Sequence, residues 1–315
     1  MKLFYHHPQS AGDIALYPKT IAAIGNFDGV HRGHQALLTT VKTLSIQKNL
    51  PLLIVVFEPQ TREYFLKDQA PPRLTTLRKK LQLFKQFDVD FVCCLRFDHN
   101  LAKMSATDFA QKVIFLQLQV KHLLVGHDFR FGCDKEGDVA LLQQIGHCFH
   151  AQVDAYPDVV FHGQRVSSTL IRQALKAGHL EDAKRWLGRP YALCGRVIYG
   201  DGRAGAWGIP TANIKLHQNI LPLQGVFFVQ VRLLQGQIYW GVANIGHRPT
   251  VDGTRALLEV HILEFAQSLY GQRIEVTFLH KWRDEIRFAA VDQLIRQIHQ
   301  DIAAAKAYFL EQRLC

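Results

Sequence analysis

Residues 24–38 read IGNFDGVHRGHQALL, and this stretch contains the signals for a strand, a turn and a helix in immediate succession. The apolar run that ends at Ile24 breaks at Gly25, where a glycine allows the backbone to turn tightly. After Gly33, apolar residues recur with the period of an amphipathic helix. The stretch therefore predicts a β-strand that passes through a short turn into an α-helix.

The same alternation continues along the first half of the chain. Continuous apolar runs are typical of strands buried on both faces, and helical periods lie between them. Strands and helices in this rhythm indicate an α/β domain with a parallel sheet wound by helices. The predicted buried strands are residues 50–59, 91–97 and 121–126, and the predicted helices are residues 75–87, 106–118 and 167–188.

The pattern changes near Arg189 and Pro190. Beyond them, short alternating, β-branched segments are separated by closely spaced glycines and prolines, which is typical of an antiparallel all-β domain, here a small β-barrel. A final helix is predicted at about residues 291–311, with Leu294, Ile298, Ile302, Ala305 and Phe309 on one face. A chain of 315 residues exceeds the usual size of one core, so we expect two domains, residues 1–186 and 187–315.

Composition describes a soluble, cytoplasmic protein. Hydrophobic residues make up 48% of the chain, and neither a membrane helix nor a secretory signal is apparent. We interpret the six cysteines as reduced thiols, with a zinc site or a disulfide framework as the alternative. The net charge of +10 suits anionic partners, but the basic residues are dispersed. Their densest cluster, Arg78, Lys79 and Lys80, is interpreted as the solvated face of a helix.

The turn of the opening stretch carries candidate chemistry. In wound sheets, ligands bind beyond the carboxyl ends of the strands, and helix N-termini attract phosphate. Gly25 and Gly29 would let phosphate oxygens approach the backbone. His31 and His34 stand near the start of the helix and could donate hydrogen bonds to a phosphoryl group that gains charge. The alternative is that one histidine caps the helix and the other packs.

The motif GNFDGVHRGH resembles the signature of the nucleotidyltransferase superfamily, and more specifically that of the bacterial bifunctional riboflavin kinase/FAD synthetases. The resemblance extends along essentially the whole chain, and the order and spacing of the motifs argue against coincidence. The other matching stretches are FEPQTREYF (57–65), RLTTLRKKL (73–81), VGHDFRFG (125–132), VSSTLIRQAL (166–175), LGRPYALCGRVIYGDG (187–202), WGIPTANI (207–214), GVANIGHRPT (241–250) and LEVHILEF (258–265).

For the first half, the resemblance implies a Rossmann-like nucleotidyltransferase domain that transfers an adenylyl group from ATP to FMN, giving FAD and pyrophosphate. His31 and His34 would stabilise charge on the triphosphate, and Asp128 and Phe129 would belong to the flavin pocket, although Phe129 could be a core residue. The serine and threonine hydroxyls before a helix could equally be ordinary caps. Asp28 could contact the nucleotide or, as the alternative, orient the turn. The residues implied in ATP and phosphate binding are Gly25, Phe27, Asp28, Gly33, Ser167, Ser168, Thr169 and Arg172.

For the second half, the resemblance implies a riboflavin kinase barrel that uses ATP and Mg²⁺ to convert riboflavin to FMN. Thr211 and Asn213 offer the oxygen ligands that magnesium prefers. Glu259 is the candidate general base, because a carboxylate in an apolar strand is costly without a role, and a paired structural glutamate is the alternative. His261 is interpreted as a supporting residue. The residues implied in the ATP loop are Gly200, Arg203, Gly208 and Pro210.

One departure from the family pattern lies just before the residues PTAN (210–213). The family usually carries a Gly-Arg pair there, whereas this chain reads Arg203-Ala204-Gly205-Ala206-Trp207, so Arg203 is expected to take over the phosphate contact. The expected partners are riboflavin, FMN, FAD and ATP, with no nucleic acid and no membrane, and the chain is expected to be a monomer or a weak oligomer. The alternatives are a nucleotidyltransferase for another nucleotide, and a nucleic-acid-binding or flavin-sensing protein without activity.

Overall fold

The structure is a computed structural model, and it describes residues 1–8, 18–200, 207–216, 218, 220–250 and 253–313. The chain forms two compact units. Unit 1 contains Met1–Pro71 and Leu77–Ser167, and unit 2 contains Pro72–Thr76 and Ser168–Cys315. The short segment Pro72–Thr76 belongs to unit 2 because Leu74 is buried in the core of that unit.

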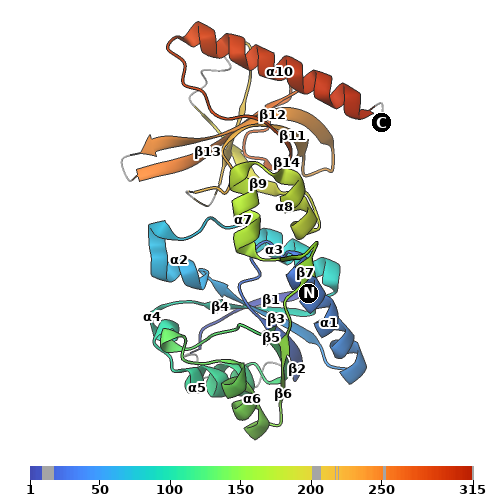
Figure 1. The fold of residues 1–315 in the computed structure, drawn as a ribbon, viewed down its shortest axis with the longest axis vertical. Coiled ribbons are helices and arrows are strands. Elements are labelled where there is room, and N and C mark those ends of the chain that lie inside the picture. The colour runs from blue at the N-terminus through green and yellow to red at the C-terminus, as the bar shows by residue number, and fades with distance from the viewer. Residues whose placement is uncertain (9–17, 201–206, 217, 219, 251–252, 314–315) are drawn as a thin grey trace. The chain divides into compact units, whose positions relative to one another are not determined.

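Six parallel strands form the sheet of unit 1, in the order β1–β4–β3–β2–β5–β6 (Figure 1). From β2 the chain proceeds to β3 and β4 on one side, and β5 and β6 lie on the other, so the order reverses between β2 and β5. Ligands of such sheets bind at this reversal. The strands are β1 (Lys2–His6), β2 (Thr20–Ile24), β3 (Leu52–Glu58), β4 (Phe91–Arg96), β5 (Val120–Gly126) and β6 (Gln152–Tyr156).

Helices cover both faces of this sheet. Alternate residues of a strand point to opposite faces, and β2 shows this clearly. Ile21 and Ala23 pack with Leu38 and Val41 of α1, whereas Ala22 and Ile24 belong to the core on the other face. The helices of unit 1 are α1 (Arg32–Lys48), α2 (Thr61–Leu66), η1 (Lys67–Gln69), α3 (Leu77–Phe84), η2 (Lys85–Phe87), α4 (His99–Ala102), α5 (Ala106–Asp108), η3 (Phe109–Gln117), η4 (Cys133–Lys135) and α6 (Val139–Cys148).

Two expectations for the first half need correction. The helix predicted over residues 167–188 is two helices, α7 (Ser168–Ala177) and α8 (Leu180–Leu187). Gly178 separates them with a positive φ of 82°, and the amide of His179 donates to the carbonyl of Ala174, which ends α7. Within 106–118, η3 is wound as a π-helix, which the apolar period does not distinguish from an α-helix.

Unit 2 contains a closed antiparallel barrel in the order β10–β13–β12–β11–β14–β9, and β9 pairs with β10 to close it. This confirms the expected all-β architecture of the second half. The barrel strands are β9 (Ala192–Ile198), β10 (Ala212–Lys215), β11 (Gly225–Arg232), β12 (Ile238–Thr250), β13 (Gly253–Ile262) and β14 (Arg273–Arg283). A two-stranded ribbon of β7 (Val160–Phe161) and β8 (Gln164–Arg165) belongs to unit 1.

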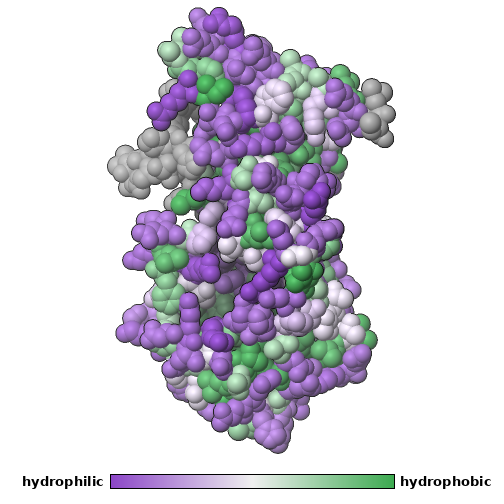
Figure 2. All heavy atoms as spheres, viewed as in Figure 1, coloured by the Kyte–Doolittle hydropathy of each residue, from purple (hydrophilic) through white to green (hydrophobic). Residues whose placement is uncertain are grey.

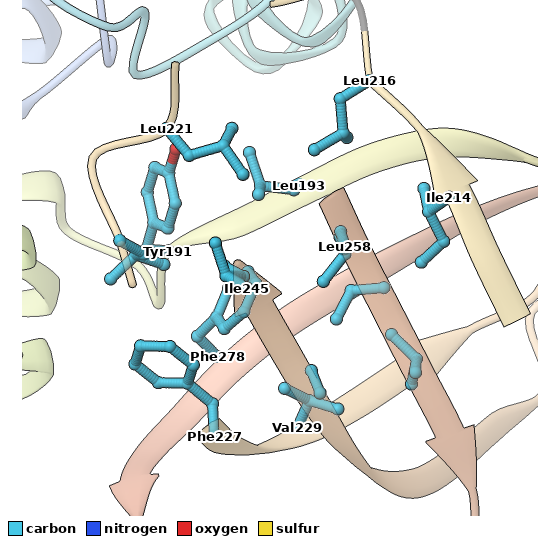
Figure 3. Packing of buried hydrophobic residues seen from close by; sticks show 14 of the residues in the cluster. Tyr191, Leu193, Ile214, Leu216, Leu221, Phe227, Val229, Ile245, Leu258 and Phe278 are labelled. Atoms are coloured by element: carbon cyan, nitrogen blue, oxygen red, sulfur yellow. The ribbon is translucent and has the colours of Figure 1, made fainter. Parts of the chain in front are cut away.

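The barrel interior is a packed hydrophobic core. Phe227, Val229, Ile245, Leu258 and Phe278 point toward one another between the strands (Figure 3). The rings of Phe227 and Phe278 meet edge to face, with centroids 5.3 Å apart. Because alternate residues fill the interior, the residues between them face the outside of the barrel.

Helices pack against the outside of the barrel. The last helix, α10 (Val291–Arg313), places Ala305 and Phe309 on Phe228 of β11. Helices α7 and α8 contribute Ile171 and Leu187, among others, to the main core of unit 2. The compact unit that contains the barrel thus includes α7 and α8, and the expected domain boundary at residue 187 stays a prediction.

The surface carries mainly hydrophilic residues on the face drawn in Figure 2, and the hydrophobic residues there form small separate groups. In the described part of the chain, no helix is long and apolar enough to cross a membrane. Cys93, Cys94, Cys133, Cys148 and Cys194 are free thiols, and Cys315 lies outside the described residues.

The barrel core generates a stability prediction. Phe227→Ala is expected to lower the free energy of unfolding of unit 2 by about 3–5 kcal/mol, because it removes a fully buried ring and leaves a cavity. All four tryptophans lie in unit 2, so denaturant titration followed by tryptophan fluorescence reports on this unit. Leu234→Ala, at a side chain that is 73% exposed, is the control and should change the value by less than about 0.5 kcal/mol. Equal effects of the two changes would contradict the packing described here.

Candidate functional site

A strained turn joins β2 to α1 at the point where the strand order of unit 1 reverses. Phe27, Gly29 and Val30 all have positive φ, with values of 46°, 86° and 42°. Glycine adopts such values without cost, whereas a phenylalanine or a β-branched valine does so only when the surroundings enforce it. Phe27 and Val30 are both buried in the core of unit 1, which holds the turn in this conformation.

His31 and His34 lie side by side at the start of α1. His31 is the N-cap residue, and its Nδ1 accepts a hydrogen bond of 3.3 Å from the backbone amide of His34. The imidazole rings are stacked with centroids 3.6 Å apart. Because Nδ1 of His31 accepts, a neutral His31 carries its proton on Nε2 and can donate from that atom. His31 therefore caps the helix, as one of the two alternatives expected, and its part in the chemistry stays a prediction.

Gly33 and Phe27 shape the space around the two histidines. A Cβ atom at Gly33 would lie 3.1 Å from ring atoms of His31, so this glycine gives the imidazole room. Phe27 packs its ring 5.2 Å from that of His34, and only 2% of Phe27 is exposed. Asp28, between them in sequence, is also buried. Phe27 thus supports the turn, and contact of Phe27 or Asp28 with a nucleotide stays a prediction.

The residues predicted to bind phosphate fall on both sides of the point in the sequence where the chain passes from unit 1 to unit 2. Ser167 is the last residue of unit 1, and Ser168 begins α7 in unit 2, which also contains Thr169 and Arg172. Nε of Arg172 donates a hydrogen bond of 2.7 Å to the carbonyl oxygen of Pro72, within unit 2. The role of these residues as a phosphate clamp stays a prediction.

Asp128 forms an ion pair on the surface of unit 1. Its carboxylate accepts a hydrogen bond of 2.6 Å from Nη2 of Arg165, and Nε of the same arginine lies 2.8 Å from Asp158. The hydrogen bond from Arg165 lowers the pKa of Asp128. Phe129 is half-buried and stacks on Phe131, with centroids 5.7 Å apart, so it belongs at least in part to the core.

A second site is a cavity of about 490 Å³ on the outer face of the barrel in unit 2. It contains several residues singled out from the sequence, namely Gly200, Pro210, Thr211, Asn213 and Glu259. Gly208 has a positive φ and is not among the lining residues. Arg203, the expected phosphate ligand of this loop, lies outside the described residues.

Glu259 faces this cavity because of its register in the barrel. Its neighbours Leu258 and Val260 are fully buried in the interior, so Glu259 points outward. Its partner on β10 is Asn213, and its partner on β12 is Asn244. Residues opposite one another on adjacent strands share a face, so one carboxylate lies between two amides.

Two close approaches fix the side chains around Glu259. A Cβ atom at Gly200 would clash with the side-chain amide of Asn213, so the glycine leaves room for that amide in its present position. The ring Nδ1–H of His261, two residues beyond Glu259 on the same face, donates to the carbonyl oxygen of Pro210 over 2.9 Å. His261 therefore ties β13 to the PTAN segment, and its supporting role in the reaction stays a prediction.

Helix α10 contributes part of the cavity lining. Leu294, Ile298 and Ile302 line it, as expected for the apolar face of this helix. Asp301 anchors the helix, since its buried carboxylate accepts hydrogen bonds from Nε and Nη2 of Arg283, from Nε1 of Trp282 and from Nε2 of Gln297.

Sequence reasoning missed several polar residues of this cavity. A signal existed for two of them, because Asp301 lies on the apolar face of a helix and Asn244 alternates with buried residues of a strand. The same argument from the cost of burial had identified Glu259. The missed polar lining residues are Asn244, Arg283, Glu285 and Asp301.

Two protein families match this chain. The FAD synthetase family matches residues 14–170, and the riboflavin kinase family matches residues 187–309. A bifunctional riboflavin kinase/FMN adenylyltransferase of Haemophilus influenzae is 44% identical over 286 residues, 91% of this chain and 93% of that protein. The protein of the same description from Escherichia coli strain K12 is 45% identical over 289 residues, 92% of each chain.

A solved structure resembles the chain along nearly its whole length. It is a crystal structure from Streptococcus pneumoniae, described as a macrolide-efflux protein, with a TM-score of 0.80 and 29% sequence identity. The match covers 96% of this chain and 98% of that one. The combination of a wound parallel sheet and a closed barrel in one chain is thus shared with a known structure.

The Asp128–Arg165 pair generates a titration prediction. Arg165→Gln is expected to raise the pKa of Asp128 toward its ordinary value, because it removes the hydrogen bond that stabilises the carboxylate. Since the pKa in the folded protein is the lower one, the pair stabilises the fold at higher pH, and this contribution is lost as pH falls through the lowered pKa. Carboxyl ¹³C NMR during an acid titration measures the change.

Arg130→Gln is the matched control for that titration. Arg130 is exposed, and its guanidinium donates to the backbone carbonyl of Phe129 rather than to Asp128. The pKa of Asp128 should therefore not move in this variant. A pKa of Asp128 that is the same in Arg165→Gln and in the unaltered protein would contradict the assignment.

Proposed function

Because this chain belongs to the bifunctional riboflavin kinase/FMN adenylyltransferase family, we propose that the outer cavity of its barrel is the kinase site and that the β2–α1 turn is part of the adenylyl-transfer site. The enzyme catalyses two successive reactions. ATP phosphorylates riboflavin to FMN, and a second ATP transfers its adenylyl group to FMN, giving FAD and pyrophosphate.

The position of Glu259 supports the kinase assignment most directly. In this reaction the 5′-hydroxyl oxygen of riboflavin forms a bond to the γ-phosphorus of ATP, and the bond from that phosphorus to the β-γ bridging oxygen breaks to release ADP. The carboxylate of Glu259 takes the hydroxyl proton as general base. A carboxylate between Asn213 and Asn244, in a cavity also lined by apolar side chains, is suited to this task.

The residues beside Glu259 also fit a magnesium ion. The hydroxyl of Thr211 and the amide oxygen of Asn213 are hard ligands, and both residues line the cavity. The absence of a side chain at Gly200 leaves a cradle for the Asn213 amide. Thr211 and Asn213 would hold Mg²⁺, which when bound would neutralise charge on the phosphates of ATP.

Apolar walls complete the kinase site. Val226, Val242 and Leu257 on the barrel face Ile298 and Ile302 on α10 across the cavity. Such walls suit the flat ring of a flavin and exclude water, which would otherwise compete with riboflavin for the γ-phosphoryl group. The buried contact of Asp301 with Arg283 keeps the helical wall in place.

In unit 1, the two histidines support adenylyl transfer. A phosphate oxygen of FMN attacks the α-phosphorus of ATP, and the bond to the bridging oxygen breaks to release pyrophosphate. Nε2–H of His31 can donate to a phosphate oxygen whose charge grows in this step. The N-terminus of α1 adds the attraction that helix ends exert on anions.

The remaining residues identified from the sequence are proposed as contacts of the substrates. We propose Ser167, Ser168, Thr169 and Arg172 as contacts of the triphosphate in the first half, with Asp128 and Phe129 at the flavin end. Arg203 is proposed as the cation of the kinase loop. We propose that the enzyme works in the cytoplasm, as a monomer or a weak oligomer, on riboflavin, FMN and ATP.

Glu259→Gln separates the two activities. This near-isosteric change removes the proton acceptor, so kcat for FMN formation from riboflavin, ATP and Mg²⁺ is expected to fall by at least about 10²-fold. FAD formation from supplied FMN should stay within about 2-fold of the unaltered enzyme, because Glu259 is not among the residues proposed for adenylyl transfer. Chromatographic separation of the flavins measures both rates, and Glu264→Gln, at an exposed residue of unit 2, is the control. Loss of both activities together would argue against separate sites.

His31→Ala is expected to have the reciprocal effect. It removes the hydrogen-bond donor and the cap of α1, so kcat for FAD formation from FMN should fall by about 10²–10³-fold while FMN formation is retained. His147→Ala, at an exposed residue of unit 1, provides the control in the same assay. An unchanged rate of FAD formation would remove His31 from the mechanism.

A further inference from the structure

Lys80 is fully buried, which contradicts its interpretation as part of a solvated helix face. The exposed fraction of Lys80 is 0%, whereas Arg78, two residues earlier on α3, is exposed. The helix has an amphipathic period, yet this lysine lies on the side that faces the protein. A buried ammonium group loses its hydration and needs compensating contacts, so a lysine at this position is costly unless it has a specific task.

The ammonium group of Lys80 reaches the β2–α1 turn. Its Nζ donates a hydrogen bond of 2.7 Å to the backbone carbonyl oxygen of Asn26, 54 residues away in sequence. That carbonyl belongs to the peptide group that precedes Phe27, whose φ is 46°. Rotation of this peptide group to a more ordinary conformation would take the oxygen away from Nζ. The hydrogen bond therefore stabilises the left-handed conformation at the start of the turn.

Other contacts hold the same end of the turn. Phe84, one helical turn beyond Lys80 on α3, packs its ring edge to face against Phe27, with centroids 5.6 Å apart. The side-chain amide of Asn26 donates to Oγ1 of Thr61 over 3.3 Å. Among these contacts, Lys80 contributes the one full charge, and a charge-assisted hydrogen bond is stronger than a neutral one.

We propose that Lys80 is a positioning residue for adenylyl transfer, which acts by fixing the peptide group between Asn26 and Phe27 and thereby the arrangement of His31 and His34. The inference rests on the proposed function of the β2–α1 turn. The turn supplies the cap of α1, so a displaced peptide group at its start changes where the two imidazoles lie. A misplacement of about 1 Å in a catalytic group can cost about 10²-fold in rate.

Lys80→Met tests this role, because methionine fills a similar volume without a donor or a charge. We expect kcat for FAD formation from FMN to fall by at least about 30-fold, while the KM for FMN changes by less than about 3-fold, since a positioning defect acts on the transition state. Riboflavin kinase activity of the same molecule is the internal reference. Lys85→Met, at an exposed lysine just after α3, is the matched control and should leave both rates unchanged.

A purely structural role for Lys80 would give a different set of results. Circular dichroism follows the thermal unfolding of both units, whereas tryptophan fluorescence follows only unit 2, so loss of folding in unit 1 is visible. NMR of the imidazole nitrogens gives a second measurement. In Lys80→Met, the hydrogen bond from the His34 amide to Nδ1 of His31 should weaken. The His31 ring should then no longer be held in the one tautomer that carries its proton on Nε2. A folded variant with a normal kcat, or with an unchanged His31 signature, would overturn the proposal.

A second variant covers the case in which Lys80→Met does not fold. Lys80→Gln has a shorter, neutral side chain that cannot span the distance to the Asn26 carbonyl, and it should show the same loss of kcat. Failure of both variants to fold would assign Lys80 to the core alone and would also overturn the proposal. If the unaltered enzyme forms no FAD from FMN, the proposed function of the turn fails instead.

Discussion

Unit 1 depends on the constraint that the chain must pass from β2 into α1 within a few residues at the reversal of the sheet. Three residues of this turn adopt positive φ, and two of them are not glycine. Each such residue costs about 1–3 kcal/mol, which burial of Phe27 and Val30 offsets. The strain is thus maintained by the hydrophobic core, and it sets the start of α1 and the stacking of two imidazoles. In unit 1, the packing that stabilises the core therefore also sets the positions of the two histidines.

In unit 2, different faces of the barrel provide the stability of the core and the geometry of the site. The alternation of side chains along β13 sends Leu258 and Val260 into the barrel and Glu259 out of it. The interior can then be packed for stability alone, while the outer face carries polar residues for chemistry. The outer face would be open to water on its own, and α10 supplies the missing wall. The buried carboxylate of Asp301, which accepts hydrogen bonds from Arg283, holds this helix on the barrel and has no catalytic role in the proposed reaction.

Much of the fold was predictable because its signals are local. Strand, turn and helix at residues 24–38 follow from apolar periods and glycines, and Glu259 stood out as a charge in an apolar strand. Strand β1 was missed because it lies at the edge of the sheet and only His6 of its five residues is buried, so no periodicity shows. The break at Gly178 was missed because the apolar period of α7 continues into α8. The burial of Lys80 was not predictable, because its partner Asn26 is brought to it by the fold.

The boundary between the units has a consequence for how such an enzyme could have been assembled from simpler ones. Apart from Pro72–Thr76, which also belongs to unit 2, the chain passes from unit 1 to unit 2 between Ser167 and Ser168, within the stretch VSSTLIRQAL. A gene cut at that point would divide the motif, and a cut after residue 186 would strip α7 and α8 of the core they share with the barrel. A piece that keeps the core of unit 2 intact would therefore have to include the helical pair and also Pro72–Thr76, which is separated in sequence from the rest of that unit.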